Sequence, residues 1–215
     1  MLPVIHKTHG QSTDEELISS IKKGDARLYE IIVRRYNPYL YKIGRSYRLN
    51  HEDTQDQMQN TYLNAFYHLE DFHQRSSFKT WLSSIMIRHC YHFMKNQKSK
   101  LTISSDAAKE EWLNKSESGD MITRMELNHI IENILNDLPE MYRIVFALRE
   151  LNQHSVEESA RLLGISETNV KVRLLRAKNM IRRKIESAYH PDSIYTFLET
   201  YCNRMVDRVM KQILE

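Results

Sequence analysis

Residues 155–185 have the sequence SVEESARLLGISETNVKVRLLRAKNMIRRKI, which carries the start and stop signals of two short helices. Ser155 and Glu158 have the spacing of a capping box, in which each side chain accepts a hydrogen bond from the other residue's backbone N–H. Gly164 can take the left-handed conformation that ends a helix, and Ser166 is a good N-cap for the next one. The stretch therefore predicts a helix-turn-helix unit.

The second helix of this unit is strongly basic. Residues 167–185 contain seven Lys or Arg side chains against a single acid, Glu167. The helical period places a predicted buried line at Val170, Leu174, Ala177 and Ile181. The opposite side presents Thr168, Val172, Leu175 and Asn179, flanked by Asn169, Lys171 and Arg176. Because a phosphate backbone attracts such a surface, the helix predicts binding in the major groove of duplex DNA. The alternative is a solvated basic helix in an ordinary bundle.

The composition favours helices throughout the chain. The 215 residues include only 5 Gly and 4 Pro, and Leu, Ile, Lys, Arg and Glu are abundant, so we expect an all-α protein. The net charge is only +3 and the sequence pI is about 8.7. Basic groups can therefore attract a partner only where they are segregated from the acids.

The cysteines and the apolar segments indicate where in the cell the protein is located. Cys90 and Cys202 lie far apart in apolar helical patterns, which favours buried thiols in a reducing compartment over a disulfide. No run of 18 or more apolar residues is present, and residues 1–13 lack the apolar core of a signal peptide. We expect a cytoplasmic protein without membrane insertion.

Breaks in the helical pattern divide the chain into two small helical domains. The first is expected over residues 12–96. It begins with a helix capped by Ser12 and Glu15, and its predicted breaks are at Asn37-Pro38, Leu49-Asn50 and His73–Ser77. Residues 97–120 are rich in polar residues and form the predicted flexible linker. The helix-turn-helix domain is expected over residues 121–188.

A C-terminal extension is expected over residues 189–215, after a break at His190-Pro191. It predicts an amphipathic helix whose apolar stripe consists of Ile194, Leu198, Tyr201, Met205, Val209 and Ile213. An exposed stripe of this length is unfavourable in water. We therefore expect it to pack on the second domain or to be captured by an inhibitory partner.

Two opposite faces are predicted for the helix over residues 52–69. Its core stripe consists of Met58, Tyr62, Ala65 and Leu69. The other face gathers Asp53, Asp56, Gln59, Asn60 and Leu63. A leucine ringed by polar groups suits a protein contact. A solvated face with one stray leucine is the alternative, and the residues alone favour it.

Residues 72–105 form a second positive surface, because they contain no Asp or Glu and six Lys or Arg side chains. On the helix after Ser77, the predicted core face carries Leu82, Met86, Cys90, Phe93 and Met94, and the other face carries Trp81, Ser84, Ile85, Arg88, His92 and Lys95. Cations beside aromatic rings suit single-stranded nucleic acid, where bases can stack. Burial of Trp81 and Ile85 against the preceding helix is an equally good interpretation.

Over residues 12–187 the chain resembles the sigma factors of bacterial RNA polymerase, specifically the small extracytoplasmic-function (ECF) group. In the first domain the resemblance rests on RRYNPYLYKIGRSY at 34–47, EDTQDQMQNTY at 52–62 and FKTWLSSI at 78–85. In the second it rests on LNDLPEMYRIVFAL at 135–148 and on the helix-turn-helix stretch. The family's usual Asp-Ala-Glu-Asp is Asp53-Thr54-Gln55-Asp56 here, so this face carries less negative charge than is typical.

The resemblance implies an alternative sigma factor that binds RNA polymerase core, recognises promoter DNA and initiates transcription of a specific regulon. The clamp helices of the polymerase would bind the face formed by Asp53, Asp56, Gln59, Asn60 and Leu63. The upstream-ten promoter element would bind Arg75, Ser76, Lys79, Trp81, Arg88, His92 and Lys95. The upstream-thirty-five element would bind Thr168, Asn169, Lys171, Val172, Arg173 and Arg176 as duplex. The linker would pass through the polymerase interior, and an anti-sigma factor is an expected further partner.

No chemistry of its own is predicted for the chain. Phosphate-loop, nucleophile-elbow and paired-carboxylate motifs are absent, so we expect no enzyme activity and no cofactor. His89 and His92 do not share a helix face with each other, which argues against a metal site. Two other classes of function stay open from the residues alone. They are a dimeric regulator that binds duplex operators and a helical interaction module with no nucleic-acid role.

Overall fold

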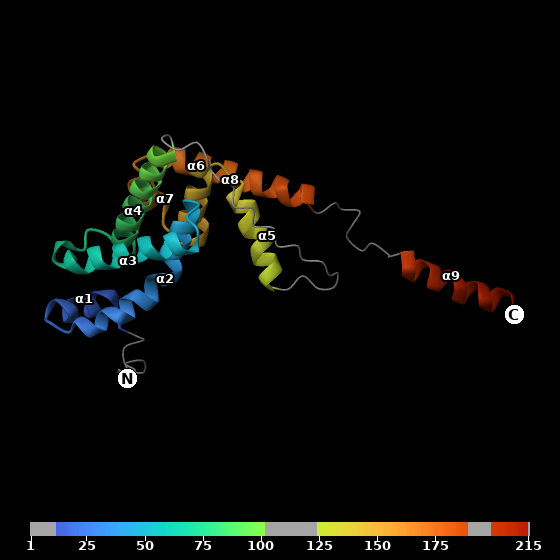
Figure 1. Ribbon diagram of the computed structural model, residues 1–215, viewed down its shortest axis with the longest axis horizontal. Helices are drawn as coiled ribbons and strands as arrows, with labels where there is room; N and C mark the ends of the chain where they lie inside the picture. The colour runs from blue at the N-terminus through green and yellow to red at the C-terminus, as the bar shows by residue number, and fades with distance from the viewer. Residues whose placement is uncertain (1–11, 102–123, 189–198, 215) are drawn as a thin grey trace.

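The structure is a computed structural model that describes residues 12–101, 124–188 and 199–214. These residues form helices and no strand, which confirms the predicted all-α fold (Figure 1). Two 3-10 turns, η1 (Ala26–Leu28) and η2 (Leu69–Asp71), and one π-helical turn, η3 (Ala147–Leu151), lie between the α-helices. The α-helices are α1 (Asp14–Lys22), α2 (Tyr29–Ser46), α3 (His51–Tyr67), α4 (Phe78–Leu101), α5 (Arg124–Asn136), α6 (Glu140–Phe146), α7 (Val156–Leu163), α8 (Glu167–Ala188) and α9 (Glu199–Leu214).

The first helix begins one residue later than its predicted cap. Thr13 is the N-cap of α1, and its hydroxyl accepts a hydrogen bond from the Glu16 backbone N–H while the Glu16 carboxylate accepts one from Thr13. The predicted box of Ser12 and Glu15 is therefore wrong, because the backbone carbonyl of Ser12 instead accepts a hydrogen bond from Arg35 of α2. The predicted apolar residues of α1 are buried, as Leu17, Ile18 and Ile21 confirm.

The predicted break at Asn37-Pro38 is wrong, because α2 continues through both residues to Ser46. Proline in a helix interior removes one backbone hydrogen bond. Here Tyr36 and Leu40 on either side are both buried in the core, and burying two large apolar side chains outweighs that loss. The predicted breaks at Leu49-Asn50 and His73–Ser77 are confirmed, and Asn50 caps α3 by accepting the Asp53 backbone N–H.

The core of the N-terminal unit lies between α2, α3 and α4. Tyr62, Ala65 and Leu69 are buried as predicted, and Met58 is half-buried. In α4 the predicted core residues Leu82, Met86 and Cys90 are fully buried. The helix extends to Leu101, since Gln and Lys are good helix formers, so its end overlaps the first residues of the predicted linker over 97–120. The remainder of that linker, residues 102–120, lies outside the described residues.

The C-terminal unit contains the predicted helix-turn-helix. Ser155 and Glu158 form both hydrogen bonds of the capping box, and Gly164 ends α7 with a φ of 63°. The predicted buried line of α8 is confirmed, with Val170 and Ala177 fully buried and Leu174 and Ile181 half-buried. These local signals fix the geometry of α7 and α8, and therefore which side of α8 faces outward.

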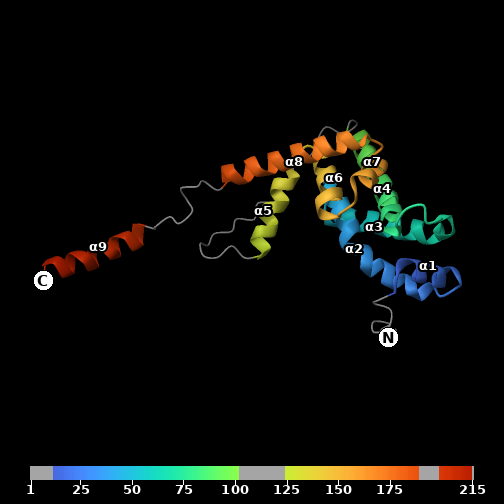
Figure 2. The same ribbon diagram turned by 180° about the vertical axis from the view of Figure 1, so that it is seen from behind.

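The two units pack against one another. In both views α7 lies beside α4, and α6 lies beside α2 (Figures 1 and 2). Ile144 and Leu148 of the C-terminal unit belong to the same buried apolar cluster as the N-terminal core, and Leu162 and Leu163 pack on it. The sequence predicts two units but gives no sign that they share a core.

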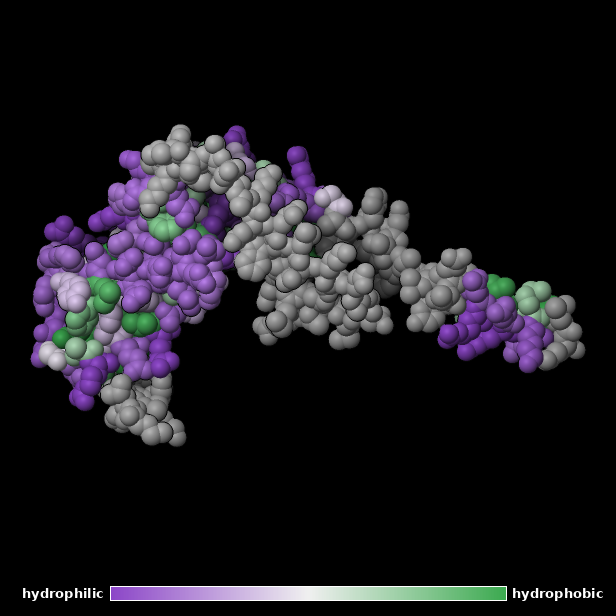
Figure 3. Space-filling view, in the orientation of Figure 1, coloured by the Kyte–Doolittle hydropathy of each residue, from purple (hydrophilic) through white to green (hydrophobic). Residues whose placement is uncertain are grey.

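The C-terminal helix α9 lies apart from these units (Figure 1). Its stripe residues Met205, Val209 and Ile213 are exposed, and apolar and charged residues lie side by side on it (Figure 3). In the structure, these stripe residues therefore do not pack on the second unit. The predicted stripe residues Ile194 and Leu198 lie outside the described residues. None of the described helices is long and apolar enough to cross a membrane.

Candidate nucleic-acid interface

The outward side of α8 presents the residues predicted to meet duplex DNA. Thr168, Lys171, Val172 and Arg176 are exposed. Asn169 and Arg173 are half-buried, and the Arg173 guanidinium Nε donates to the Asn169 side-chain oxygen at 2.9 Å. This bond orients the guanidinium toward the start of the helix. Four of the six predicted residues therefore lie on the outward side of α8, and Asn169 and Arg173 lie at its margin, beside the buried line.

The positive charge of α8 is least neutralised near its N-terminus. Lys178 pairs with Glu150 at 2.9 Å, and Lys184 pairs with Asp137 at 2.5 Å. Among the described residues, Lys171 and Arg173 have no acidic partner. Unpaired cations attract phosphate most strongly, because no carboxylate must first be displaced. The N-terminal half of α8 is therefore the part best suited to contact DNA.

The predicted upstream-ten surface is split by the structure into an open and a covered part. Arg75, Arg88, His92 and Lys95 are exposed, and Ser76 is half-buried. The Lys79 ammonium instead donates a hydrogen bond to the backbone carbonyl of Asn152 in the C-terminal unit. In this arrangement Lys79 is half-buried and its ammonium contacts the other unit.

Trp81 and Ile85 differ in their burial. Ile85 is only 6% exposed, so the interpretation of this residue as part of a nucleic-acid face is wrong and its burial in the core is confirmed. Trp81 is half-buried, and its ring lies 5.3 Å from that of Phe72 and 5.5 Å from that of Phe78, measured between ring centroids. The aromatic cluster anchors the start of α4, because three large rings bury one another.

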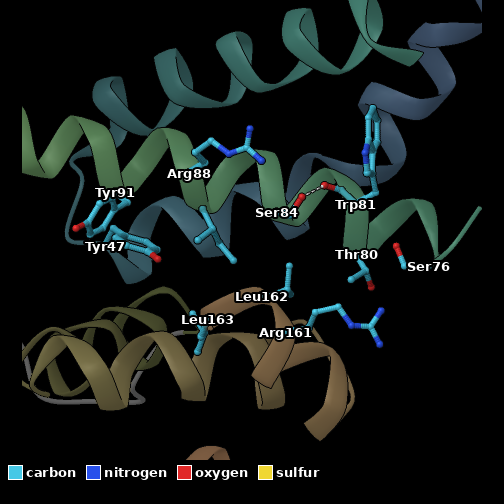
Figure 4. Close-up of a pocket in the computed structure, with 11 residues that line it drawn as sticks. Tyr47, Ser76, Thr80, Trp81, Ser84, Arg88, Tyr91, Arg161, Leu162 and Leu163 are labelled. Carbon is cyan, nitrogen blue, oxygen red and sulfur yellow. Dashed lines mark hydrogen bonds between the residues drawn. The ribbon is translucent and has the colours of Figure 1, made fainter. Parts of the chain in front are cut away.

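A cleft of about 530 Å³ separates α4 from α7. Trp81, Ser84 and Arg88 line it on the α4 side, and Arg161, Leu162 and Leu163 line it on the α7 side (Figure 4). The wall of α4 that carries predicted upstream-ten residues therefore faces the C-terminal unit across this cleft.

The face of α3 opposite its core stripe is open. Asp56, Gln59, Asn60 and Leu63 are exposed, with Leu63 48% exposed, and Asp53 is half-buried. Partial burial and the neighbouring charges of Asp56 and Glu52 raise the pKa of the Asp53 carboxyl. Burial is the larger of these causes, and the two nearby carboxylates add to it.

Polar contacts between the units were not predicted from the sequence. On the α4 side, the Thr80 hydroxyl donates to the Glu158 carboxylate at 2.6 Å, and Ser83 shares a hydrogen bond of 3.2 Å with His154. On the α2 side, the Asn152 amide donates to the backbone carbonyl of Tyr39 at 3.0 Å. In the sequence, LNQH at residues 151–154 only interrupts the helical pattern and does not indicate a contact with the first unit.

Two further cations, one from each unit, form hydrogen bonds between α2 and the C-terminal unit. Lys42 donates to the backbone carbonyl of Leu151 at 3.1 Å. The Arg143 guanidinium Nε donates to the backbone carbonyl of Ser46 at 2.7 Å, and Arg143 is 3% exposed. Burial lowers the pKa of Arg143 to about 10. Both cations bind the carboxyl end of a helical segment, where the helix dipole is negative.

His154 is the titratable group most perturbed by this packing. It is 1% exposed. The pKa of its imidazole is lowered to about 4, mainly by burial and also by the charges of Lys79 and Arg149, while Glu158 partly offsets them. The Glu158 carboxyl itself has a lowered pKa, because hydrogen bonds from Thr80 and Ser155 outweigh the effect of burial. His154 is therefore neutral at pH 7 in this arrangement.

No described cluster of three His, Cys, Asp or Glu side chains is arranged to hold a metal ion. His89 is half-buried and His92 is exposed. Burial and the neighbouring charges of Arg88 and His92 lower the pKa of His89.

Acidification is expected to loosen the contact between the units. The His154 pKa of about 4 lies below the ordinary value of 6.5, so its stabilising effect is complete above about pH 6.5 and is lost as the pH falls toward about 4. The resulting decrease in the free energy of unfolding should reach at most about 3 kcal/mol. Urea titrations across this range should show a steeper fall in the free energy of unfolding for the natural chain than for His154→Gln. Parallel curves would contradict this assignment.

Two stretches of the chain match families of known proteins. Residues 32–100 match Sigma-70 region 2, and residues 128–181 match Sigma-70, region 4. The first stretch includes α3 and nearly all of α4, and the second includes the helix-turn-helix. Together they cover more than half of the chain.

Curated relatives match along nearly their whole length. The ECF RNA polymerase sigma-E factor of Haemophilus influenzae is 26% identical over 189 residues, which cover 82% of this chain and 97% of the relative. The protein of that name from Escherichia coli K12 is 28% identical over 185 residues, which cover 82% of this chain and 96% of the relative.

Solved structures share the fold. CnrH, in complex with the cytosolic domain of CnrY, has a TM-score of 0.60 at 22% identity, covering 82% of this chain and 99% of that chain. The sigma factor RpoE from Bartonella quintana, in complex with the anti-sigma factor NepR, has a TM-score of 0.61 at 20% identity, covering 74% and 96%. With both sigma-70 regions present in the predicted order, the chain belongs to the ECF group of the sigma-70 family of bacterial RNA polymerase sigma factors.

Proposed function

We propose that this sigma factor divides its work between four segments. Residues 12–96 bind polymerase core and the upstream-ten element, and residues 121–188 bind the upstream-thirty-five element. Residues 97–120 link them, and residues 189–215 are accessory. Members of the family are transcription initiation factors and not enzymes. The observation that carries the proposal is the separation of one acidic, leucine-bearing face on α3 from the basic faces on α4 and α8.

The face of α3 supports a contact with the polymerase clamp helices. Leu63 is a large exposed apolar side chain, and Asp53, Asp56, Gln59 and Asn60 surround it. An apolar anchor inside a polar ring is the usual form of a protein contact. Membership of the family makes the alternative of a stray leucine the less favoured interpretation.

The faces of α4 and α8 support contacts with two parts of a promoter. Arg75, Ser76, Lys79, Trp81, Arg88, His92 and Lys95 are proposed to hold the opened upstream-ten element, whose phosphates and unpaired bases suit cations and rings. Thr168, Asn169, Lys171, Val172, Arg173 and Arg176 are proposed to bind the upstream-thirty-five element as duplex.

An anti-sigma factor is the proposed regulatory partner. The relative from Bartonella quintana was solved in complex with the anti-sigma factor NepR. In this chain the exposed apolar residues of α9, among them Met205, Val209 and Ile213, offer a surface for such a partner. We also propose a cytoplasmic location, because Cys90 is a buried free thiol, which fits a reducing compartment.

Run-off transcription tests the proposed function directly. Sequencing of transcripts after overexpression identifies promoters, and one of these serves as the template. Purified polymerase core should initiate at that promoter only when the chain is added. Failure of the chain to bind core, or equal initiation without it, would overturn the proposal.

The α3 face is tested by removing its anchor and one of its acids. Asp56→Ala combined with Leu63→Ala should weaken binding to polymerase core about tenfold or more, because both side chains are lost from the centre of the contact. Binding is measured by fluorescence anisotropy of labelled chain. Glu15→Ala removes an exposed acid of α1 and should leave the affinity unchanged. Equal affinity of the double variant and the natural chain would contradict the assignment.

The α8 face is tested through the salt dependence of DNA binding. Lys171→Ala combined with Arg176→Ala should weaken binding to promoter duplex and reduce the slope of log K against log salt by about 1 for each phosphate contact removed. Holoenzyme binding to the promoter duplex is measured between about 50 and 200 mM salt. Lys23→Ala combined with Arg27→Ala removes the same charge near α1 and serves as the control. An unchanged slope in the α8 variant would sink the assignment.

A further inference from the structure

A cavity of about 420 Å³ is lined by α2, α5 and the segment formed by α6 and η3. The helices α2, α5 and α6 lie beside one another in both ribbon views (Figures 1 and 2). Proteins bind small organic molecules in mostly apolar cavities of about 300–1,000 Å³. The cavity falls in this range, and its apolar lining consists of Tyr41, Ile131, Leu135, Phe146, Ala147 and Leu151.

The α5 wall of this cavity is incompletely packed. Ile131 is 44% exposed, and Leu135 is half-buried. A polar contact joins α5 to α2, in which the Arg45 guanidinium Nε donates to the Glu132 carboxylate at 2.9 Å. Apolar atoms that border a cavity lack van der Waals partners on one side. A ligand with an apolar body would supply those partners.

The charged groups around the cavity favour an anion. Lys42, Arg45 and Arg143 line it, and Glu132 is the one acid among its lining residues. Three cations against one carboxylate leave a formal charge of +2. Glu132 pairs with Arg45, whereas Lys42 and Arg143 donate to backbone carbonyls, which carry no net charge. Because apolar walls screen charge poorly, a negative group on the ligand is attracted.

Arg143 also has a donor that the protein leaves unused. The side chain is 3% exposed, and its Nε and Nη1 donate to the carbonyls of Ser46 and Leu138 at 2.7 Å each. Nη2 is buried and has no hydrogen-bond partner among the described residues. A buried donor without an acceptor is unfavourable, and folded proteins usually supply one. Since Nη2 is shielded from solvent, an acceptor in the cavity reaches it after a small shift of the guanidinium or of the loosely packed α5 wall.

We propose that this cavity binds a small organic carboxylate, with its apolar body against Ile131, Leu135 and Phe146 and its carboxylate beside Arg143, where it accepts the Nη2 hydrogen bond. A carboxylate suits this position because hydrogen bonds between ionised partners are the stronger ones. None of the lining residues belongs to the proposed polymerase or promoter contacts. The site is therefore independent of the proposed function, and so is its test.

Calorimetric titration of the full chain with two matched compounds tests the site. Phenylbutyrate carries an aromatic body and a carboxylate, and phenylbutanol carries the same body with a neutral hydroxyl. Phenylbutyrate should bind at one site per chain and at least about tenfold more tightly than phenylbutanol, because only the carboxylate is charged.

Two variants locate the binding. Ile131→Trp enlarges an exposed side chain on the cavity wall and should weaken binding of both compounds about tenfold or more by filling the cavity. Glu132→Gln removes the lining acid and releases Arg45, so it should strengthen binding of phenylbutyrate at least about threefold and leave phenylbutanol unchanged. A damaged fold would not produce such a selective gain.

Glu157→Gln is the matched control, because Glu157 pairs with Arg161 on α7 and neither residue lines the cavity. It should leave both affinities unchanged. Any of four results would overturn the inference: no binding of phenylbutyrate by the natural chain, equal affinities for the two compounds, unchanged binding by Ile131→Trp, or no gain for phenylbutyrate in Glu132→Gln.

Discussion

The turn from Asn152 to His154 determines how the two units of this sigma factor meet. Asn152 and His154 are fully buried, and a buried polar group is unfavourable unless it is hydrogen-bonded. Three of their partners come from the other unit, namely the Tyr39 carbonyl, the Lys79 ammonium and the Ser83 hydroxyl. Their backbone N–H groups and the His154 carbonyl bond within the C-terminal unit, and the Asn152 side-chain oxygen has no partner. This requirement fixes the position of the C-terminal unit on α2 and α4.

The same contact can be released at modest free-energy cost. Water can replace each protein partner of the turn when the units separate, because polar groups are solvated well in the open state. The apolar part of the contact consists of Ile144 and Leu148, with Leu162 and Leu163 packed on the same cluster. Interfaces between domains of one chain are commonly of this mixed kind, and relative motion of the domains is expected.

Local signals in the sequence predicted most helix starts and ends. They could not predict the features that depend on packing between distant residues. The capping box at Ser155 and the left-handed Gly164 predicted the helix-turn-helix correctly, since both act within one turn of chain. The predicted break at Pro38 was wrong, because core packing of α2 overrides a local preference. Lys79 and Asn152 are 73 residues apart, and both have side chains that usually face water. Nothing in their local sequence indicates that they meet. Helical spacing also predicted that Asp53, Asp56, Gln59, Asn60 and Leu63 share one face of α3. The proposed contact of this face with polymerase rests on the resemblance to the family.

The most direct test of the central claim is the distance between the units in solution. Spin labels at Tyr67→Cys on α3 and Glu157→Cys on α7, both exposed positions, report it by pulsed dipolar spectroscopy in a Cys202→Ser background. The free chain should give one narrow, short distance, and the promoter-bound holoenzyme should give a much longer one. A broad, long distribution in the free chain would show that the units do not pack on one another, and would contradict the contact described at Asn152 and His154.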